Sequence, residues 1–220
     1  MAKHLEKELD RLKKLIYALS AHVAENLELA VKSLQDNDVE QAEQVIALDL
    51  AIDDMEIEVE EECLKALALY QPVAIDLRFI VAVMKLNNDL ERIGDLAADI
   101  AKNGIAINAA PKPKVPLDLN QMCYLAKAIV HKSLDALVNI DPYLAREVIK
   151  DDEAIDNLKA EMKAEIVAAL QREPEHAETL MTLLAVTHRL ERIGDHATNI
   201  AEDVIYMVEA DIVRHQSIDS

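Results

Sequence analysis

The chain carries one six-residue stretch twice: Leu-Glu-Arg-Ile-Gly-Asp, at residues 90–95 and again, letter for letter, at residues 190–195. Ile-Ala follows both copies in step, at residues 100–101 and 200–201. An identity repeated at a fixed offset indicates that one structural unit is used twice. We therefore predict an internal duplication.

The composition of the 220-residue chain favours helices. Glycine occurs 3 times and aromatic residues make up 3%, so strands and turns have little to be built from. With 23 Lys and Arg against 42 Asp and Glu, the formal net charge is −19. This charge repels nucleic-acid phosphates and anionic lipid headgroups, so we do not expect direct binding to DNA.

The cysteines and the N-terminal residues bear on the compartment. Cys63 and Cys123 are isolated on apolar helix faces, so we interpret them as small buried hydrophobic residues of a reducing compartment. Residues 1–10 are dense in charge, and no apolar run approaches the ~18 residues that a membrane span needs. We therefore expect neither export nor membrane insertion of this chain.

Apolar periodicity and helix-breaking residues predict three long helices in each half. In the first half they cover about residues 5–34, the stretch from the N-cap Asp38 to Tyr70, and about residues 75–107. In the second half one helix ends at about Asn139, the next runs from the Asp141-Pro142 N-cap to Gln171, and the last carries the second repeated stretch.

The Pro-rich tract over residues 111–116 is the predicted linker, because it cannot continue a helix. It separates a first repeat, residues 1–110, from a second, residues 117–220. Short connections place neighbouring helices antiparallel, so each repeat is expected to be an up-down-up bundle. The predicted fold class is all-α, with two tandem three-helix bundles.

Each half carries two pairs of acidic residues, and the members of a pair are four residues apart in the sequence. This spacing places both carboxylates on one helix face. The pairs are Asp49 with Asp53 and Glu91 with Asp95 in the first half, and Asp152 with Asp156 and Glu191 with Asp195 in the second.

Counting along the chain brings the two pairs of each half to one level. The residue midway between Asp53 and Glu91 is Pro72, and Pro72 is also midway between Asp49 and Asp95. In the second half the corresponding midpoint falls between residues 173 and 174. In an antiparallel hairpin the paired acids are therefore level, about 28 Å from the turn at 1.5 Å per residue. Counting leaves the direction of each side chain around its helix open.

Four carboxylates at one level repel one another unless a cation lies between them. Mg²⁺, Mn²⁺, Ca²⁺ or iron would supply that charge and prefer oxygen ligands. The alternative is a solvated acidic face, which is common in an acidic chain. The duplication favours a metal, because Glu56 and Glu60 are matched by Lys159 and Lys163, whereas the four-residue pairs are repeated.

Two further residue types of the repeated stretch have structural interpretations. Glycine in mid-helix costs ~1 kcal/mol relative to alanine, so Gly94 and Gly194 are expected to have a packing reason. Arg92 and Arg192 are interpreted as ion-pair partners of the acids rather than as phosphate ligands.

Three classes of function are compatible with these residues. The first is a metal-binding regulatory adaptor, and the second is a metal-free helical scaffold. The third is a carboxylate-bridged di-metal enzyme, but neither Glu91 nor Glu191 starts the Glu-x-x-His motif that such bundles use. The chain also lacks a Gly-rich phosphate loop and a Ser/His/Asp set, so we do not expect an enzyme.

The repeated stretch resembles the signature of the PhoU family, accessory regulators of bacterial phosphate-specific transport. In the second copy His-Ala-Thr-Asn-Ile-Ala-Glu follows at residues 196–202, and residues 72–78 resemble the segment leading into the family's third helix. The resemblance implies two bundles related by a pseudo-twofold axis and a cytoplasmic negative regulator of the phosphate-starvation response. Its implied partners are the transporter's ATP-binding subunit and the sensor histidine kinase, and a homodimer is the favoured assembly.

The resemblance also implies metal clusters on the bundle surfaces, with iron, zinc, magnesium or manganese as the ion. At matching positions the ligands would be Asp49, Asp53, Glu91 and Asp95 in one bundle and Asp152, Asp156, Glu191 and Asp195 in the other. Asp99 and Asn199, one turn further on, would be fifth donors. The first copy departs from the family pattern at Leu96 and Asp99, so the two sites are expected to differ.

Overall fold

The computed structural model describes residues 2–115 and 117–210, and this part of the chain is all-α, as predicted. Its helices are α1 (Ala2–Asp36), α2 (Val39–Tyr70), α3 (Ile75–Ala109), α4 (Leu119–Asn139), α5 (Pro142–Arg172), the short 3₁₀ helix η1 (Pro174–His176) and α6 (Ala177–Glu209). Residue 116 of the expected linker and residues 211–220 of the expected second repeat lie outside the described residues.

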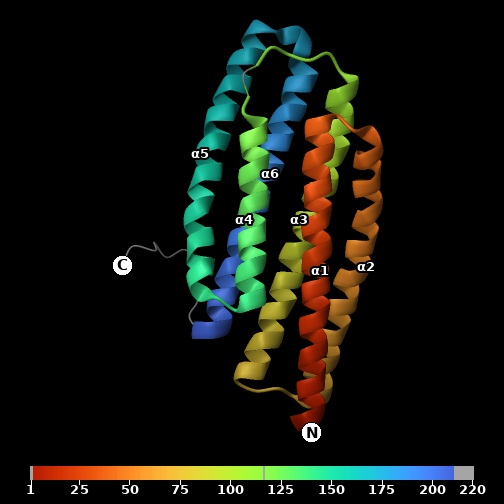
Figure 1. Ribbon diagram of the computed structural model, residues 1–220, viewed down its shortest axis with the longest axis vertical. Coiled ribbons are helices and arrows are strands. Elements are labelled where there is room, and N and C mark those ends of the chain that lie inside the picture. The colour runs from red at the N-terminus through yellow and green to blue at the C-terminus, as the bar shows by residue number, and fades with distance from the viewer. Residues whose placement is uncertain (1, 116, 211–220) are drawn as a thin grey trace.

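Two three-helix bundles lie side by side along the long axis of the molecule, α1–α3 in one and α4–α6 in the other (Figure 1). The turn between α2 and α3 lies at one end of this axis, and the turn between α5 and α6 lies at the opposite end (Figure 1). The bundles are thus oppositely directed, as a pseudo-twofold relation between the repeats requires.

The helix ends follow the local sequence signals. Asp38 caps α2 by accepting a hydrogen bond from the backbone N–H of Gln41 at 3.0 Å. Asp141 caps α5 in the same way, with Pro142 in the first turn. After α2 the chain turns through Gln71 in the left-handed region, whereas Pro174 opens a 3₁₀ turn after α5. The two hairpins therefore turn differently while their long helices remain equivalent.

One apolar core runs through both bundles. The repeated stretches contribute fully buried side chains in equivalent places, Leu90 and Ile93 from α3 and Leu190 and Ile193 from α6. Free Cys63 and Cys123 are also fully buried, so their interpretation as small core residues is confirmed. The core stripe of α3 and α6 leaves the opposite helix face to the acidic residues.

The bundles meet mainly where α3 and α6 pack against each other, and α1 and α4 form a smaller contact. Arg189 Nε donates to Asp99 Oδ2 at 3.0 Å, and Asn199 Nδ2 donates to Asp89 Oδ1 at 3.0 Å. Asp89 matches Arg189 and Asp99 matches Asn199 at the offset of the repeat, so the pseudo-twofold axis exchanges these two contacts. His196 Nδ1 joins Asp89 Oδ1 at 2.8 Å. Polar contacts on α3 and α6 thus fix the packing of the two halves.

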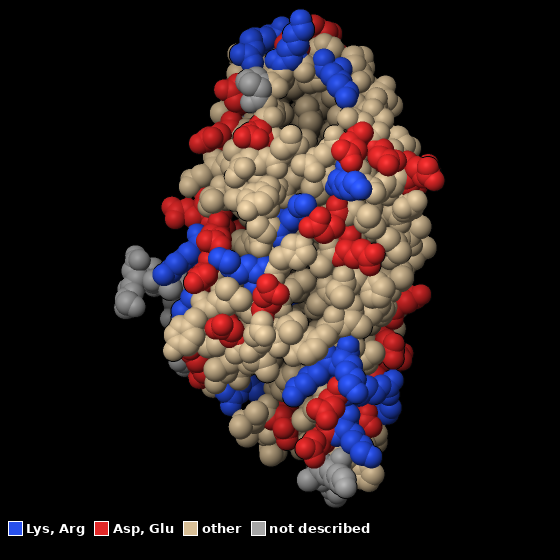
Figure 2. Space-filling model, in the orientation of Figure 1, with Lys and Arg blue, Asp and Glu red and all other residues tan. Residues whose placement is uncertain are grey.

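The surface mixes both signs of charge. On the face shown in Figure 2, acidic side chains are scattered along the molecule, and Lys and Arg gather at both ends of the long axis and also near its middle. Among residues 2–115 and 117–210, none of the helices combines the length and the apolar character that a membrane crossing requires.

Candidate metal centre

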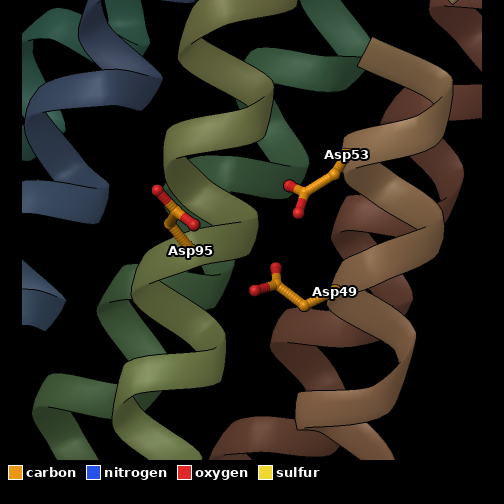
Figure 3. A group of neighbouring side chains, drawn as sticks. All are labelled: Asp49, Asp53 and Asp95. Carbon is orange, nitrogen blue, oxygen red and sulfur yellow. The ribbon is translucent and has the colours of Figure 1, made fainter. Parts of the chain in front are cut away.

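Three aspartates meet between α2 and α3 in the first bundle. Asp49 and Asp53 extend from α2 and Asp95 from α3, and one carboxylate oxygen of each lies within 4.8 Å of the others. Figure 3 shows Asp49 and Asp53 pointing from α2 towards α3, one helical turn apart. Asp49 and Asp95 are therefore level along the helices, as counting from Pro72 predicted. Their side chains also point towards each other in the direction around the helix axes, which counting left open.

A glycine lets the two helices come this close. A β-carbon on residue 94 would stand 3.1 Å from Cγ2 of Ile52 and 3.3 Å from Oδ1 of Asp49. In the second bundle a β-carbon on Gly194 would stand 2.5 Å from Oδ1 of Asp152. The expected packing reason for the mid-helix glycines is confirmed, and it places one carboxylate of each half directly against the neighbouring helix.

The Asp49 carboxylate lies in a setting that disfavours its charge. Burial, followed by the charges of Asp53 and Asp95, raises the pKa of Asp49 from 3.8 to about 6. Its buried Oδ1 atom has no hydrogen-bond partner among the described residues. Three converging carboxylates with one unpaired buried oxygen fit a hard or borderline cation, which takes oxygen ligands and cancels the repulsion.

Glu91 lies beside this group of three without belonging to it. Its side chain is 21% exposed, and its Oε2 atom lies 3.3 Å from Nε of Arg92. Burial, followed by the charge of Asp95, raises the pKa of Glu91. Arg92 also donates through Nη1 to Oδ2 of Asp95 at 3.0 Å. Its interpretation as an ion-pair partner of the acids is confirmed.

The two residues expected as fifth donors are engaged elsewhere. The Asp99 carboxylate lies 3.0 Å from Nε of Arg189 and 3.4 Å from Nζ of Lys102. Asn199 donates to Asp89 across the interface of the bundles. Both side chains therefore serve the contact between α3 and α6.

A lysine stands among the carboxylates of the second bundle. Lys159 Nζ forms a short ion pair with Oε1 of Glu191 and lies 3.9 Å from Oδ1 of Asp156. In the described part of this bundle the acids form no group of three converging ligand oxygens like that of the first. The second cluster thus holds a lysine between its two helices, and the convergence of three carboxylate oxygens seen in the first cluster is not found in its described residues.

The charged forms of two carboxylates in the second cluster are nevertheless disfavoured by their surroundings. Burial, followed by the charges of Asp195, Asp156 and Glu191, raises the pKa of Asp152 to about 7. Burial, followed by the charge of Glu191, also raises the pKa of Asp195. Arg192 is exposed and has no ion pair within residues 2–115 and 117–210, so the expectation drawn from its sequence position holds for Arg92 only.

Sequence reasoning missed the contacts of two groups of residues. The first is Lys159, whose signal was its position three residues after Asp156, on the same helix face. The second is Asp89 with its partners His196 and Asn199, for which spacing within one half gives no signal because the contact joins the two halves.

Fold and site together define a class of protein: a duplicated helical bundle that carries an acidic cluster between the second and third helix of each half. The family model described as the PhoU domain matches residues 16–104 and again residues 119–204. The chain belongs to the PhoU family, and the resemblance noted from its sequence is confirmed.

Relatives from other organisms match nearly the whole chain. The phosphate-specific transport system accessory protein PhoU homolog of Aquifex aeolicus is 37% identical over 214 residues, covering 97% of this chain and 97% of the relative. The protein of the same name from Pseudomonas aeruginosa is 34% identical over 209 residues, covering 94% and 86%.

Solved structures match the fold over similar lengths. The crystal structure of PhoU from Pseudomonas aeruginosa superposes with a TM-score of 0.90 at 33% identity, covering 94% of this chain and 99% of that one. The phosphate transport system regulatory protein PhoU from Streptococcus pneumoniae gives a TM-score of 0.86 at 30% identity, covering 95% and 99%. These matches confirm the two-bundle architecture.

Proposed function

We propose that this protein is an accessory regulator of phosphate-specific transport that restrains the phosphate-starvation response in the cytoplasm. Its proposed partners are the transporter's ATP-binding subunit and the sensor histidine kinase, and it acts by binding rather than by catalysis, as a homodimer. Support comes from the family match in both halves and from the names of the relatives. The net charge of −19 favours basic surfaces on these partners.

The metal is the part of the proposal that depends on this chain's own geometry. Asp49, Asp53 and Asp95, with Glu91 beside them, would hold a divalent or trivalent ion such as iron, zinc, magnesium or manganese. The observation behind this proposal is the convergence of three carboxylates around an unpaired buried oxygen of Asp49. A bound cation would draw α2 and α3 together at this level, and α3 in turn contacts α6.

Metal binding is tested by melting curves of the full chain in EDTA and in excess Mn²⁺. A ligand that binds only the folded state stabilises it by about 2.7 kcal/mol at a hundred times Kd, so the midpoint should rise with Mn²⁺. Asp95→Asn should remove this rise. The matched control is Asp54→Asn, since Asp54 is exposed on α2 and has no ion pair in the described residues. A metal-free scaffold would show no rise, and Asp95→Asn would then stabilise it by removing repulsion.

Regulation is tested by the affinity of the protein for the ATP-binding subunit and for the kinase from the same organism. The wild type should bind both, and a variant with Asn at positions 49, 53 and 95 should bind more weakly. No binding by the wild type would refute the adaptor function. Equal affinities of the wild type and the variant would refute control by the metal.

A further inference from the structure

The second acidic cluster holds a side-chain cation where the first holds another carboxylate. Lys159 on α5 matches Glu56 on α2 in the alignment of the two halves. Glu56 acts electrostatically on Glu91, since its charge contributes to raising the pKa of that residue. Lys159 occupies the corresponding place, where its ammonium group contacts Glu191 and Asp156.

The Lys159 ammonium group is held between α5 and α6 rather than extended into solvent. The Lys159 side chain is 26% exposed, and the side chain of its partner Glu191 is 14% exposed. A side chain of this length reaches from α5 to α6 and contacts a carboxylate on each helix. A metal ion bound by Asp156 and Glu191 would have to displace this ammonium group and would then face a like charge at close range.

We propose that Lys159 takes the place of the cation in the second cluster, so that this chain has one metal centre, in the first bundle. The inference depends on the proposed function in one respect only, namely that the first bundle binds the metal. Lys159 then links Asp156 on α5 to Glu191 on α6 and offsets part of the repulsion among the four acids, at any metal concentration. Only the first bundle responds to the metal.

Two reciprocal exchanges test this inference. Lys159→Glu gives the second cluster the charge pattern of the first, and Glu56→Lys gives the first cluster that of the second. Binding of Mn²⁺ to the full chain is measured by calorimetry and by elemental analysis after gel filtration. Asp95→Asn and Asp195→Asn, combined with each exchange, report which cluster holds the metal.

In the wild type, Asp95→Asn should abolish Mn²⁺ binding and Asp195→Asn should leave it unchanged. Lys159→Glu should add a second set of bound ions, which Asp195→Asn removes. Glu56→Lys should abolish binding, and the double exchange should restore binding that depends on Asp195 instead of Asp95. The inference would be overturned if Asp195→Asn reduced Mn²⁺ binding of the otherwise wild-type protein as much as Asp95→Asn does.

Further variants separate the role of Lys159 from effects on folding and from metal binding in the first bundle. Glu56 accepts a hydrogen bond from Nδ2 of Asn87 through Oε1 at 3.2 Å, so Glu56→Gln, which retains an acceptor there, accompanies Glu56→Lys. Lys159→Gln removes the ammonium group without adding a carboxylate and should also gain Mn²⁺ binding that Asp195→Asn removes. If the wild type binds no Mn²⁺ but both Lys159 variants do, the first-bundle proposal fails and the role of Lys159 stands. If neither Lys159 variant gains binding, the role of Lys159 is refuted.

Discussion

Oδ1 of Asp49 lies directly against the backbone of Gly94, at 3.3 Å from the point where a β-carbon would stand. The same β-carbon would lie 3.1 Å from Cγ2 of Ile52, which is buried in the core. The glycine of the repeated stretch therefore sets both the spacing of α2 and α3 and the position of a carboxylate. A substitution at this position should affect stability and metal binding together.

We expect Gly94→Ala to be less stable than Gly104→Ala by about 1–3 kcal/mol, because an added methyl group overpacks the site beside Ile52. Gly104 is also in α3, and a β-carbon there would meet Leu34 at an ordinary 3.4 Å. Gly104→Ala should thus stabilise the protein by roughly 0.5–1 kcal/mol through helix propensity. Urea unfolding of the two variants measures the difference. Equal stabilisation of both would show that the close approach of α2 is not needed.

Acidic pH should stabilise the metal-free protein through Asp49 and Asp152. Their pKa values are raised from 3.8 to about 6 and about 7 in the folded state. Between about pH 4 and pH 7 the folded protein holds protons that the unfolded chain has released, so this contribution to the free energy of unfolding falls as the pH rises. Urea unfolding in EDTA at about pH 5 and pH 8 measures this fall.

The variant with Asn at positions 49 and 152 isolates these two groups from all others that titrate. It should lose less stability than the wild type between the two pH values. An equal or larger loss in the variant would contradict the assignment. Mn²⁺ competes with the proton on Asp49, so its affinity for the wild type should increase with pH over the same range.

Asp89 should contribute strongly to stability because it accepts two hydrogen bonds from the other bundle. It is 8% exposed and accepts from Nδ2 of Asn199 at 3.0 Å, with His196 Nδ1 at 2.8 Å. Asp89→Ala leaves these partly buried groups without a partner and should cost about 1–3 kcal/mol in thermal or urea unfolding. Asp54→Ala, on an exposed helix face, should change stability by less than about 0.5 kcal/mol. Similar effects of both substitutions would show that the interface does not depend on this contact.

The two thiols should be unreactive in the folded protein. Burial raises the pKa of Cys63 and of Cys123 to about 12, so almost no thiolate is present near neutral pH. A coloured disulfide reagent should label both residues only in urea, at the rate of unfolding. Labelling of the native protein at the rate of free cysteine would contradict the buried positions.

Much of the fold is local in origin and was therefore predictable. The caps Asp38 and Asp141 provide backbone hydrogen bonds that any helix start needs, and the prolines end the preceding helices. The register of Asp49 and Asp53 against Asp95 follows from equal rise per residue on both arms of a hairpin. Counting therefore located the cluster correctly along the helices.

The direction of side chains around the helices and the contacts between the halves could not be predicted in this way. Asp99 has the right axial position for a ligand, but its turn of α3 also faces α6, and Arg189 engages it there. Lys159 was interpreted only as evidence that acidity was not repeated. Its reach to Glu191 depends on the conformation of a long side chain, which spacing alone does not determine.

The contacts between α3 and α6 make the halves complementary rather than interchangeable. Arg189 faces Asp99, and Asp89 faces Asn199, at sites that the pseudo-twofold axis exchanges. Two copies of the first half, assembled with the same geometry, would place Asp89 opposite Asp99 at both sites, where two carboxylates would face each other without the arginine and the amide that the second half supplies. Divergence between the repeats has thus made the first half depend on the second for the polar partners of Asp89 and Asp99.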